Sequence, residues 1–235
     1  MKKVLLAALA LFTFTSAMAL DNEPKPGLTF QGQVGLDISN LRGSHFDAKP
    51  GANLGIYGQY MFEKAHGTYL FAGVDYAMKG AKHDMILVKG TIKNKLHYID
   101  VPVHIGFQYN IIPELGVFAD FGPYFGVGVG GRNSFDFESD GIPDFHKNIY
   151  KDHYNGTYGN DIDKYDAIRA QRFDWGLGFR VGAEYNQHYS INFAFDWGLV
   201  DILKDDYRSA YFKDLKRSLP NYKTFNTAIT LGYRF

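Results

Sequence analysis

The most constraining feature of this sequence is an alternation of apolar with polar or small side chains that continues to the final residue. In FNTAITLGYRF, residues 225–235, most of the large apolar and aromatic side chains fall on every second position. Because successive side chains of a β-strand point to opposite faces of a sheet, this rhythm predicts a strand with one apolar face. Chain ends usually fray unless they are tied down, so the aromatic terminus Phe235 indicates that this strand is held in a sheet.

Seven earlier stretches repeat the same alternation, which makes eight strands in all. Each is near the ~10 residues that a tilted strand needs to cross a bilayer. They span residues 28–38, 53–62, 68–79, 96–109, 116–129, 172–185 and 188–200. The connections alternate between short turns and long loops, the long ones being 39–52, 80–95, 130–171 and 201–222. This pattern predicts an all-β fold, an eight-stranded antiparallel up-and-down transmembrane β-barrel with short periplasmic turns and long extracellular loops.

Alternation alone leaves open which face points outward, because a soluble lipocalin-like barrel also alternates, with its apolar face inward. Here one face of the predicted strands carries most of the aromatic side chains, and the other carries most of the glycines and ionisable groups. The interior of an eight-stranded barrel is only wide enough for a filling of side chains. We therefore expect the aromatic face to contact lipid, with a buried strand of a soluble sandwich as the alternative.

The aromatic residues of this outward face are expected at two heights, as in the girdles of outer-membrane barrels. The predicted periplasmic girdle contains Phe30, Tyr60, Phe62, Tyr109, Tyr185, Tyr189, Tyr233 and Phe235. The predicted outer girdle contains Tyr76, Phe173, Trp175 and Trp197. The last strand is expected to close the barrel on the first, where the barrel insertion machinery could read Phe235.

The N-terminus has the features of a secretory signal. Residues 1–19 begin with two lysines, continue with an apolar stretch and end with Ala17-Met18-Ala19, so the mature barrel domain is expected to span 20–235. No later run of about 18 apolar residues occurs, which argues against a helical span. The chain has no cysteine and zero net charge, which argue against disulfides and thiolate sites and against a nucleic-acid partner. We expect the cell outer membrane of a Gram-negative envelope, with membrane lipid as a partner.

Several motifs, in their order along the chain, resemble the PorT-like outer-membrane β-barrel family. They are GLDISNLRG (35–43), DYAMKGAK (75–82), YIDVPVHIGFQY (98–109), FADFGPYFG (118–126), WGLGFRVGAEY (175–185), FDWGLVDI (195–202) and TLGYRF (230–235). The resemblance implies an outer-membrane barrel, in a family whose members mostly have no assigned activity and whose founding type is associated with a secretion system. The connection 130–171 has no counterpart in this pattern.

The predicted register also places ionisable groups and prolines inside the barrel. The inward ionisable residues are Asp37, Asp75, Lys79, Asp100, His104, Asp120, Asp174, Arg180, Glu184, Asp196 and Arg234. In a narrow lumen such groups must pair, so an internal salt-bridge plug is the favoured interpretation and an ion or proton path is the alternative. Pro102 and Pro123 fall within strands, where each removes a ladder hydrogen bond, and bulges are expected there.

Sequence motifs give little support for catalysis. His188-Tyr189-Ser190 contains the His-x-Ser spacing found in lipid A deacylases, but it lies beside a short turn at the periplasmic end. No GxSxG or HExxH motif occurs, and GVGVGG at 126–131 belongs to a strand. We expect a non-enzymatic envelope anchor, or a barrel that presents its loops to an unknown envelope or extracellular partner, with no catalytic residue and no cofactor. The alternatives are a narrow pore or secretion accessory and, less favoured, a lipid-modifying enzyme.

A calcium site is a further hypothesis for the long loop, where DFESDGIPD spans residues 136–144. Its acidic residues alternate toward a glycine turn, as in calcium loops, and DGIPD resembles thrombospondin type 3 repeats. The candidate ligands are Asp136, Glu138, Asp140 and Asp144. Lys147 stands where an EF-hand needs a bidentate glutamate, so that motif is excluded. A solvated acidic loop is the favoured alternative.

Overall fold

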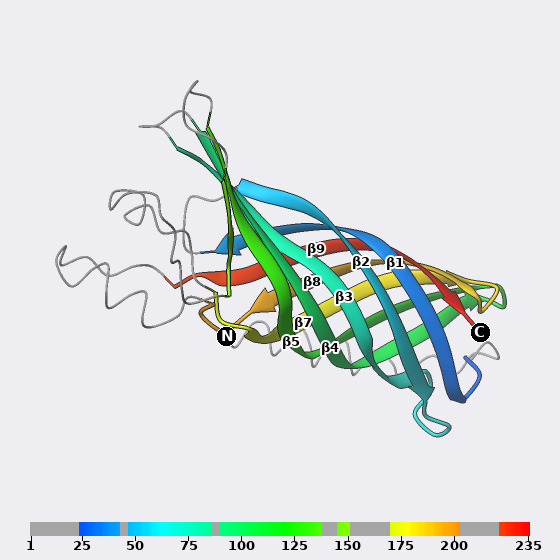
Figure 1. The fold of residues 1–235 in the computed structure, drawn as a ribbon. Coiled ribbons are helices and arrows are strands. Elements are labelled where there is room, and N and C mark those ends of the chain that lie inside the picture. Colours follow the sequence, from blue (N-terminus) through cyan, green and yellow to red (C-terminus); the bar gives the residue numbers. More distant parts are fainter. Residues whose placement is uncertain (1–23, 43–46, 86–89, 138–144, 151–169, 203–220) are drawn as a thin grey trace, which may run out of the picture.

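The computed structural model describes residues 24–42, 47–85, 90–137, 145–150, 170–202 and 221–235, which contain nine β-strands (Figure 1). The strands are β1 (Gly27–Arg42), β2 (Asp47–Met61), β3 (Thr68–Met85), β4 (Gly90–Ile112), β5 (Leu115–Phe137), β6 (Phe145–Asn148), β7 (Phe173–Tyr185), β8 (Tyr189–Gly198) and β9 (Lys223–Arg234). No helix in this part of the chain is long and apolar enough to cross a membrane. The predicted signal peptide, residues 1–19, lies outside the described residues.

Eight of these strands form a closed antiparallel barrel, which confirms the predicted fold. The hydrogen-bonded order is β4-β3-β2-β1-β9-β8-β7-β5, and β4 pairs with β5 to close the ring. As predicted, the final strand β9 joins β8 to β1. The backbone amide of Phe235 donates to the carbonyl of Phe30 at 2.9 Å, so the ladder holds the last residue of the chain.

The two ends of the barrel differ in their connections. At one end, which we call the turn side, β2 is joined to β3, β4 to β5 and β7 to β8 by short turns. Asn186 and Gln187 both have positive φ there, 52° and 62°, and the amide of His188 donates to the carbonyl of Tyr185 at 3.1 Å, so the chain reverses within a tight turn. The opposite end, the loop side, carries the long connections and corresponds to the extracellular end of outer-membrane barrels.

The strands extend further on the loop side than the sequence predicted. β4 and β5 have 23 residues each, about twice the ~10 needed to cross a bilayer. The predicted loops 39–52 and 80–95 are therefore too long, and β6 adds a short strand to β5 within the predicted loop 130–171. In Figure 1, β3, β4 and β5 leave the barrel as a ribbon. Backbone hydrogen bonds between paired strands form whether or not one face of the strands contacts lipid. The strands therefore continue to pair beyond the membrane, where apolar and polar side chains no longer alternate.

The bulges expected at the prolines are absent from the described strands. β4 and β5 keep one register from Tyr98 opposite Gly128 to Asn110 opposite Gly116, although pairing is interrupted beside Pro102 and Pro123. Each proline lacks an amide hydrogen, and the ladder loses a bond there without the insertion of a residue. The register of this strand pair shifts elsewhere, between His97 and Tyr98 and between Asn110 and Ile112.

The outer surface of the barrel is apolar, as the predicted faces require. Leu36 and Ile56 are each 73% exposed, and Val181 is 41% exposed. Aromatic side chains gather at both ends of this surface. On the turn side the ring of Tyr233 meets Tyr189 and Phe235 edge to face, with centroids 5.4 and 5.3 Å apart. On the loop side the exposed aromatics include Phe173, Trp175 and Trp197.

The lumen contains aromatic rings that the sequence did not predict there. Its buried rings are those of Tyr57, Tyr69, Phe71, Tyr98 and Tyr124. They lie over inward-facing glycines, because a Cβ atom added to Gly55 or Gly73 would collide with Tyr57, and one added to Gly106 with Tyr69. The glycines of the inner face therefore make room for rings from neighbouring strands.

Candidate functional site in the barrel lumen

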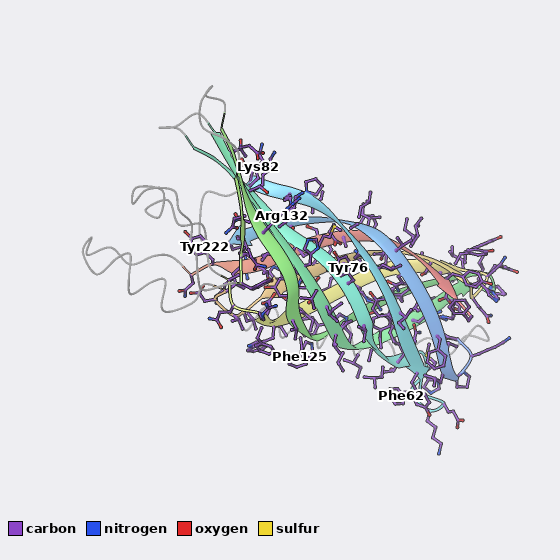
Figure 2. All side chains as sticks on the ribbon, in the orientation of Figure 1. Phe62, Tyr76, Lys82, Phe125, Arg132 and Tyr222 are labelled. Carbon is purple, nitrogen blue, oxygen red and sulfur yellow. The ribbon has the colours of Figure 1, made fainter. Side chains whose placement is uncertain are left out.

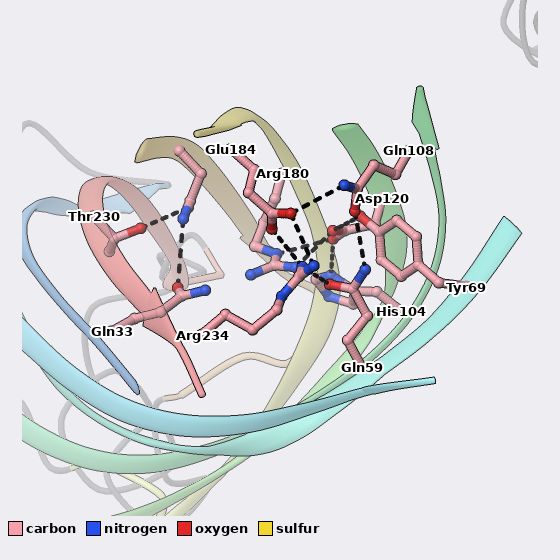
Figure 3. A network of polar contacts seen from close by, with 11 residues as sticks. Gln33, Gln59, Tyr69, His104, Gln108, Asp120, Arg180, Glu184, Thr230 and Arg234 are labelled. Carbon is pink, nitrogen blue, oxygen red and sulfur yellow. Dashed lines mark hydrogen bonds and ion pairs between the residues drawn. The ribbon is translucent and has the colours of Figure 1, made fainter. Parts of the chain in front are cut away.

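The turn-side half of the lumen is organised around one ion pair between adjacent strands (Figure 3). Asp120 of β5 lies directly opposite Arg180 of β7. The guanidinium donates from Nε to Oδ1 at 3.0 Å and from a terminal nitrogen to Oδ2 at 2.6 Å. The Tyr69 hydroxyl donates to Oδ2 at 2.7 Å, and His104 Nδ1 lies 2.7 Å from Oδ1. Both carboxylate oxygens of Asp120 are thus saturated.

The position of Tyr69 depends on a glycine between it and its acceptor. Across β3, β4 and β5 the cross-strand row reads Tyr69, Gly106, Asp120. Because Gly106 has no side chain, the phenol crosses β4 and reaches the carboxylate on β5. The guanidinium of Arg180, which binds the same carboxylate, stacks on the ring of Phe71 from β3, with Cζ 3.4 Å from the ring centroid.

A second ion pair lies nearer the turns. Arg234 bonds both oxygens of Glu184, at 2.9 and 2.6 Å, and also donates to the amide oxygen of Gln59 at 2.9 Å. Gln108 connects Glu184 to Gln59, because its amide nitrogen donates to Glu184 and its amide oxygen accepts from Gln59, each at 3.2 Å. These residues and the Asp120 cluster together fill the turn side of the lumen with polar side chains.

The loop-side half of the lumen is organised differently, around a single lysine. Lys79 is 3% exposed, and its ammonium lies 2.7 Å from Asp100 and 3.7 Å from Asp174. It also sits over the rings of Tyr98 and Tyr124, at 4.9 and 4.6 Å from their centroids. Asp174 accepts from the hydroxyl of Thr224 at 2.8 Å and from that of Tyr124 at 3.2 Å. Neutral donors therefore supplement the one cation.

A small cavity separates the two halves of the lumen. Its volume is about 60 Å³, and its lining includes Asp75, Asp100 and Asp196, with Arg180 at its turn-side boundary. Asp37, also buried, accepts a hydrogen bond from Asn53. The middle of the barrel is thus acidic, and the cavity has room for a few water molecules, which such groups require.

The loop side of the lumen is closed by an apolar cluster. Buried side chains from the barrel, Leu41, Leu96 and Tyr98, pack against Ile149 and Ile202. Ile149 follows β6 directly, and its amide donates to the carbonyl of Gly131 at 3.3 Å. Tyr150 lies over Gly128, where an added Cβ would collide with its hydroxyl. Part of the long predicted loop therefore folds inward and caps the barrel.

A closed eight-stranded barrel with an apolar exterior and a polar interior is the arrangement of small outer-membrane proteins. A family model described as outer membrane protein beta-barrel domain matches residues 7–235. The chain belongs to this family. As a member of the outer membrane protein beta-barrel family, it resides in the cell outer membrane. No curated protein matches the chain.

Solved barrels of several bacteria are similar to this family member in structure. A major outer membrane protein from Thermus thermophilus has a TM-score of 0.46 at 12% identity, with 88% of this chain and 99% of that chain covered. Neisserial surface protein A has a TM-score of 0.43 at 12% identity, covering 89% and 97%. OprG from Pseudomonas aeruginosa has a TM-score of 0.42 at 15% identity, covering 92% and 99%.

All the ionisable groups that the sequence placed inside this outer-membrane barrel lie on its lumen side. Asp120, His104 and Arg180 form one cluster and Glu184 and Arg234 another, and Lys79 joins Asp100 and Asp174. Asp37, Asp75 and Asp196 are at or near the central cavity. Sequence reasoning missed the tyrosines, the glutamines and the apolar cap, although the glycines opposite the rings carry a usable signal for the tyrosines.

The other candidate sites of the sequence are only partly described. Asp136 lies near the end of β5 and forms an ion pair of 2.6 Å with Lys93. The remaining proposed calcium ligands, Glu138, Asp140 and Asp144, lie outside the described residues, so the calcium site stays a prediction. Among the described residues no group of three or more acidic or histidine side chains could hold a metal ion.

Proposed function

We propose that this outer-membrane barrel is a non-enzymatic envelope protein that presents its loop-side strands to a partner while its lumen stays closed. The observation that carries the proposal is the filling of the lumen at two levels. The Asp120–Arg180 and Glu184–Arg234 pairs occupy the turn side, and the cluster around Leu96 and Ile149 occupies the loop side. An ion would have to displace both, since the cavity between them has a volume of only about 60 Å³.

The shape of the loop side supports a presenting role. β4 and β5 continue well beyond the length needed to span the membrane, and β3 accompanies them. A paired ribbon is stiffer than a free loop, so it holds side chains at a defined distance from the membrane surface. Binding residues are commonly carried on such projections from a rigid scaffold.

Conductance in planar bilayers tests the closed lumen. We expect the purified barrel to insert without unitary current steps, with insertion verified by the different gel mobilities of boiled and unboiled protein. A closed barrel resists unfolding in detergent because it has no free edge, so the mobility shift reports a native barrel. Stable, ion-selective openings of the wild-type protein would favour the narrow pore instead.

The arrangement around the His-x-Ser pattern supports a non-enzymatic role. His188 Nδ1 is 2.6 Å from the carbonyl oxygen of Asn186 on the exposed turn, whereas Ser190 is buried in the lumen. A nucleophile needs its general base within hydrogen-bond reach, and these two side chains lie in different environments. We expect expression of the barrel to leave the mass of lipid A unchanged, and loss of an acyl chain would support the enzyme.

We infer from the ordered motifs that the barrel is PorT-like, and we keep a role as a secretion accessory as the second candidate. The family match supports only the broader membership in outer-membrane barrels. Co-purification of the tagged, full-length barrel from native outer membranes tests this candidate. Recovery of components of one secretion system would support it, and recovery of the barrel alone would contradict it.

A further inference from the structure

The outer surface of the barrel changes character abruptly where β3, β4 and β5 leave the lipid-facing band. Along β5 the outward side chains are the exposed Phe125, Val127 and Val129, and then Arg132 follows. Along β4 the apolar Val101 and Ile99 are followed, toward the loop side, by His97 and Lys95 at alternate positions. Figure 2 shows Arg132 and Lys82 at the start of the ribbon, with Phe125 further toward the turn side.

Three cations from three strands meet at this boundary, and we call Lys49, Lys95 and Arg132 the basic boundary. Lys95 of β4 lies directly opposite Arg132 of β5. On its other side Lys95 faces Gly80 of β3, and the side chain of Lys49 from β2 extends over this glycine. Lys49 Nζ donates to the carbonyl of Asn94 at 3.4 Å, which directs the ammonium toward Lys95.

The surroundings of the basic boundary leave its positive charge largely uncompensated. Among the described outward residues of this surface the acids are Asp47 and Asp136, and Asp136 pairs with Lys93 at 2.6 Å. Within the described chain Lys49, Lys95 and Arg132 form no ion pair. Arg132 is exposed and the two lysines are half-buried, so all three are accessible.

The electrostatics of neighbouring groups are consistent with this concentration of charge. Burial, together with Lys95, Lys93 and Arg132, lowers the pKa of Lys49 to about 8. Burial, followed by the cations Lys49, Lys95 and Arg132, also lowers the pKa of His97, whose ring stacks on Tyr76 with centroids 5.8 Å apart. An anion bound among these groups would relieve their mutual repulsion.

We propose that the basic boundary binds a phosphate group on the headgroup of an outer-leaflet lipid. The height of the basic boundary on the barrel favours a lipid as the ligand. A lipid whose acyl chains pack on Val101, Val127 and Val129 would have its headgroup at the level of Lys95 and Arg132. Arginine guanidinium groups and lysine ammonium groups are common phosphate ligands in proteins. The proposal depends on the outer-membrane location and is independent of the presenting role.

The opposite side of the barrel provides an internal contrast. On β7 and β8 the loop-side boundary consists of Phe173, Trp175 and Trp197, which are exposed and uncharged. Such rings anchor a barrel in the interface without selecting an anionic lipid. The phosphate would therefore be bound at β2 to β5 and not at β7 and β8. Arg42 and Lys223, which lie opposite each other on β1 and β9, form a separate cationic pair between these two surfaces.

Lipid retention in nanodiscs tests the proposal. The full barrel is placed in phosphatidylcholine nanodiscs that contain either bisphosphorylated lipid A or the same lipid after enzymatic removal of its phosphates, and retained lipid is counted by native mass spectrometry. We expect selective retention of the phosphorylated lipid. Lys95→Gln/Arg132→Gln should weaken retention of the phosphorylated lipid by about 30-fold, because each cation at an anionic membrane surface strengthens binding by about fivefold.

A matched control removes two exposed lysines at the turn side, in Lys25→Gln/Lys64→Gln, and should retain lipid as the wild type does. Gel mobility of unboiled samples verifies that every variant is folded. Equal retention by both double variants, or equal retention of phosphorylated and dephosphorylated lipid by the wild type, would overturn the proposal. Complete displacement of the lipid by millimolar inorganic phosphate would also overturn it, because the site would then recognise a free anion and not a lipid.

Discussion

The two halves of the lumen use the same kinds of residue in opposite arrangements. In the turn-side half the cross-strand neighbour of Asp120 is Arg180, so an acid faces a base. At the central cavity, beside the loop-side cluster of Lys79 and Asp100, the cross-strand neighbour of Asp75 is Asp100, so an acid faces an acid. Like charges directly opposite one another destabilise a sheet, and opposite charges stabilise it. The turn side therefore forms the more stable plug, and the loop side depends on Lys79, neutral donors and water.

The chemistry of the two cations reinforces this difference. Arg180 presents a planar fork that saturates Asp120 in a bidentate pair. Lys79 is a point charge that must be shared, at 2.7 Å from Asp100 and 3.7 Å from Asp174. We therefore expect the turn-side ion pairs to contribute more to the unfolding free energy of the barrel than the central and loop-side groups do. Substitutions in the central and loop-side lumen should cost less stability.

Removal of the turn-side cation should have the largest effect. Arg180→Leu leaves Asp120 buried without its guanidinium, and we expect a loss of ~3 to 5 kcal/mol in unfolding free energy. Urea titration of the barrel in detergent micelles measures this loss. The double variant Asp120→Asn/Arg180→Leu, which also removes the stranded charge, should recover part of it. A loss below that of Lys79→Met would break the comparison between the two halves.

The adjacent residue of β7 tests the register on which the comparison rests. Val181 is 41% exposed on the lipid face, so Val181→Arg places a charge near the middle of the bilayer. We expect a cost of ~2 to 4 kcal/mol, measured by the same titration in lipid vesicles. Thr227→Arg, on the lipid face but near the loop-side boundary, is the control and should cost less. Wild-type stability of Val181→Arg would show that the strand faces are reversed.

Removal of the loop-side cation should have an intermediate effect. In Lys79→Met, Asp174 keeps the hydroxyl donors of Thr224 and Tyr124, and the carboxylates can take up protons. We therefore expect a loss of only ~1 to 3 kcal/mol. Because protonation would replace the lost cation, the deficit should shrink as the pH is lowered, which unfolding titrations across a pH series detect. An unchanged deficit at all pH values would contradict this explanation.

The smallest expected effect is a gain. Asp75→Asn removes one of two carboxylates that lie opposite each other, and the amide can still accept the hydrogen bond of Tyr57. We expect stabilisation of ~0.5 to 1 kcal/mol. Asp120→Asn is the matched variant on the turn side and should instead destabilise the barrel, because it weakens the contacts of Arg180 and His104. Destabilisation of similar size by both variants would remove the distinction between the halves.

The sequence alone determined the barrel, its strand faces and its closure. The two-residue period and the length of a membrane-crossing strand are local properties, so they are visible in stretches such as 225–235 without knowledge of any partner. The inward position of Asp120 and Arg180 followed from the same period. The full length of β4 and β5 could not be predicted from this period, because strands that pair outside the membrane do not need alternating apolar and polar side chains.

Only the tertiary structure decided which side chains meet. Asp120 and Arg180 are 60 residues apart in sequence, and their contact depends on the register between β5 and β7. The reach of Tyr69 across Gly106, and the inward fold of Ile149, depend on which strands become neighbours when the barrel closes. Stagger between distant strands is a property of the closed sheet, and for that reason the pairing inside the lumen and the basic boundary outside it emerge only in three dimensions.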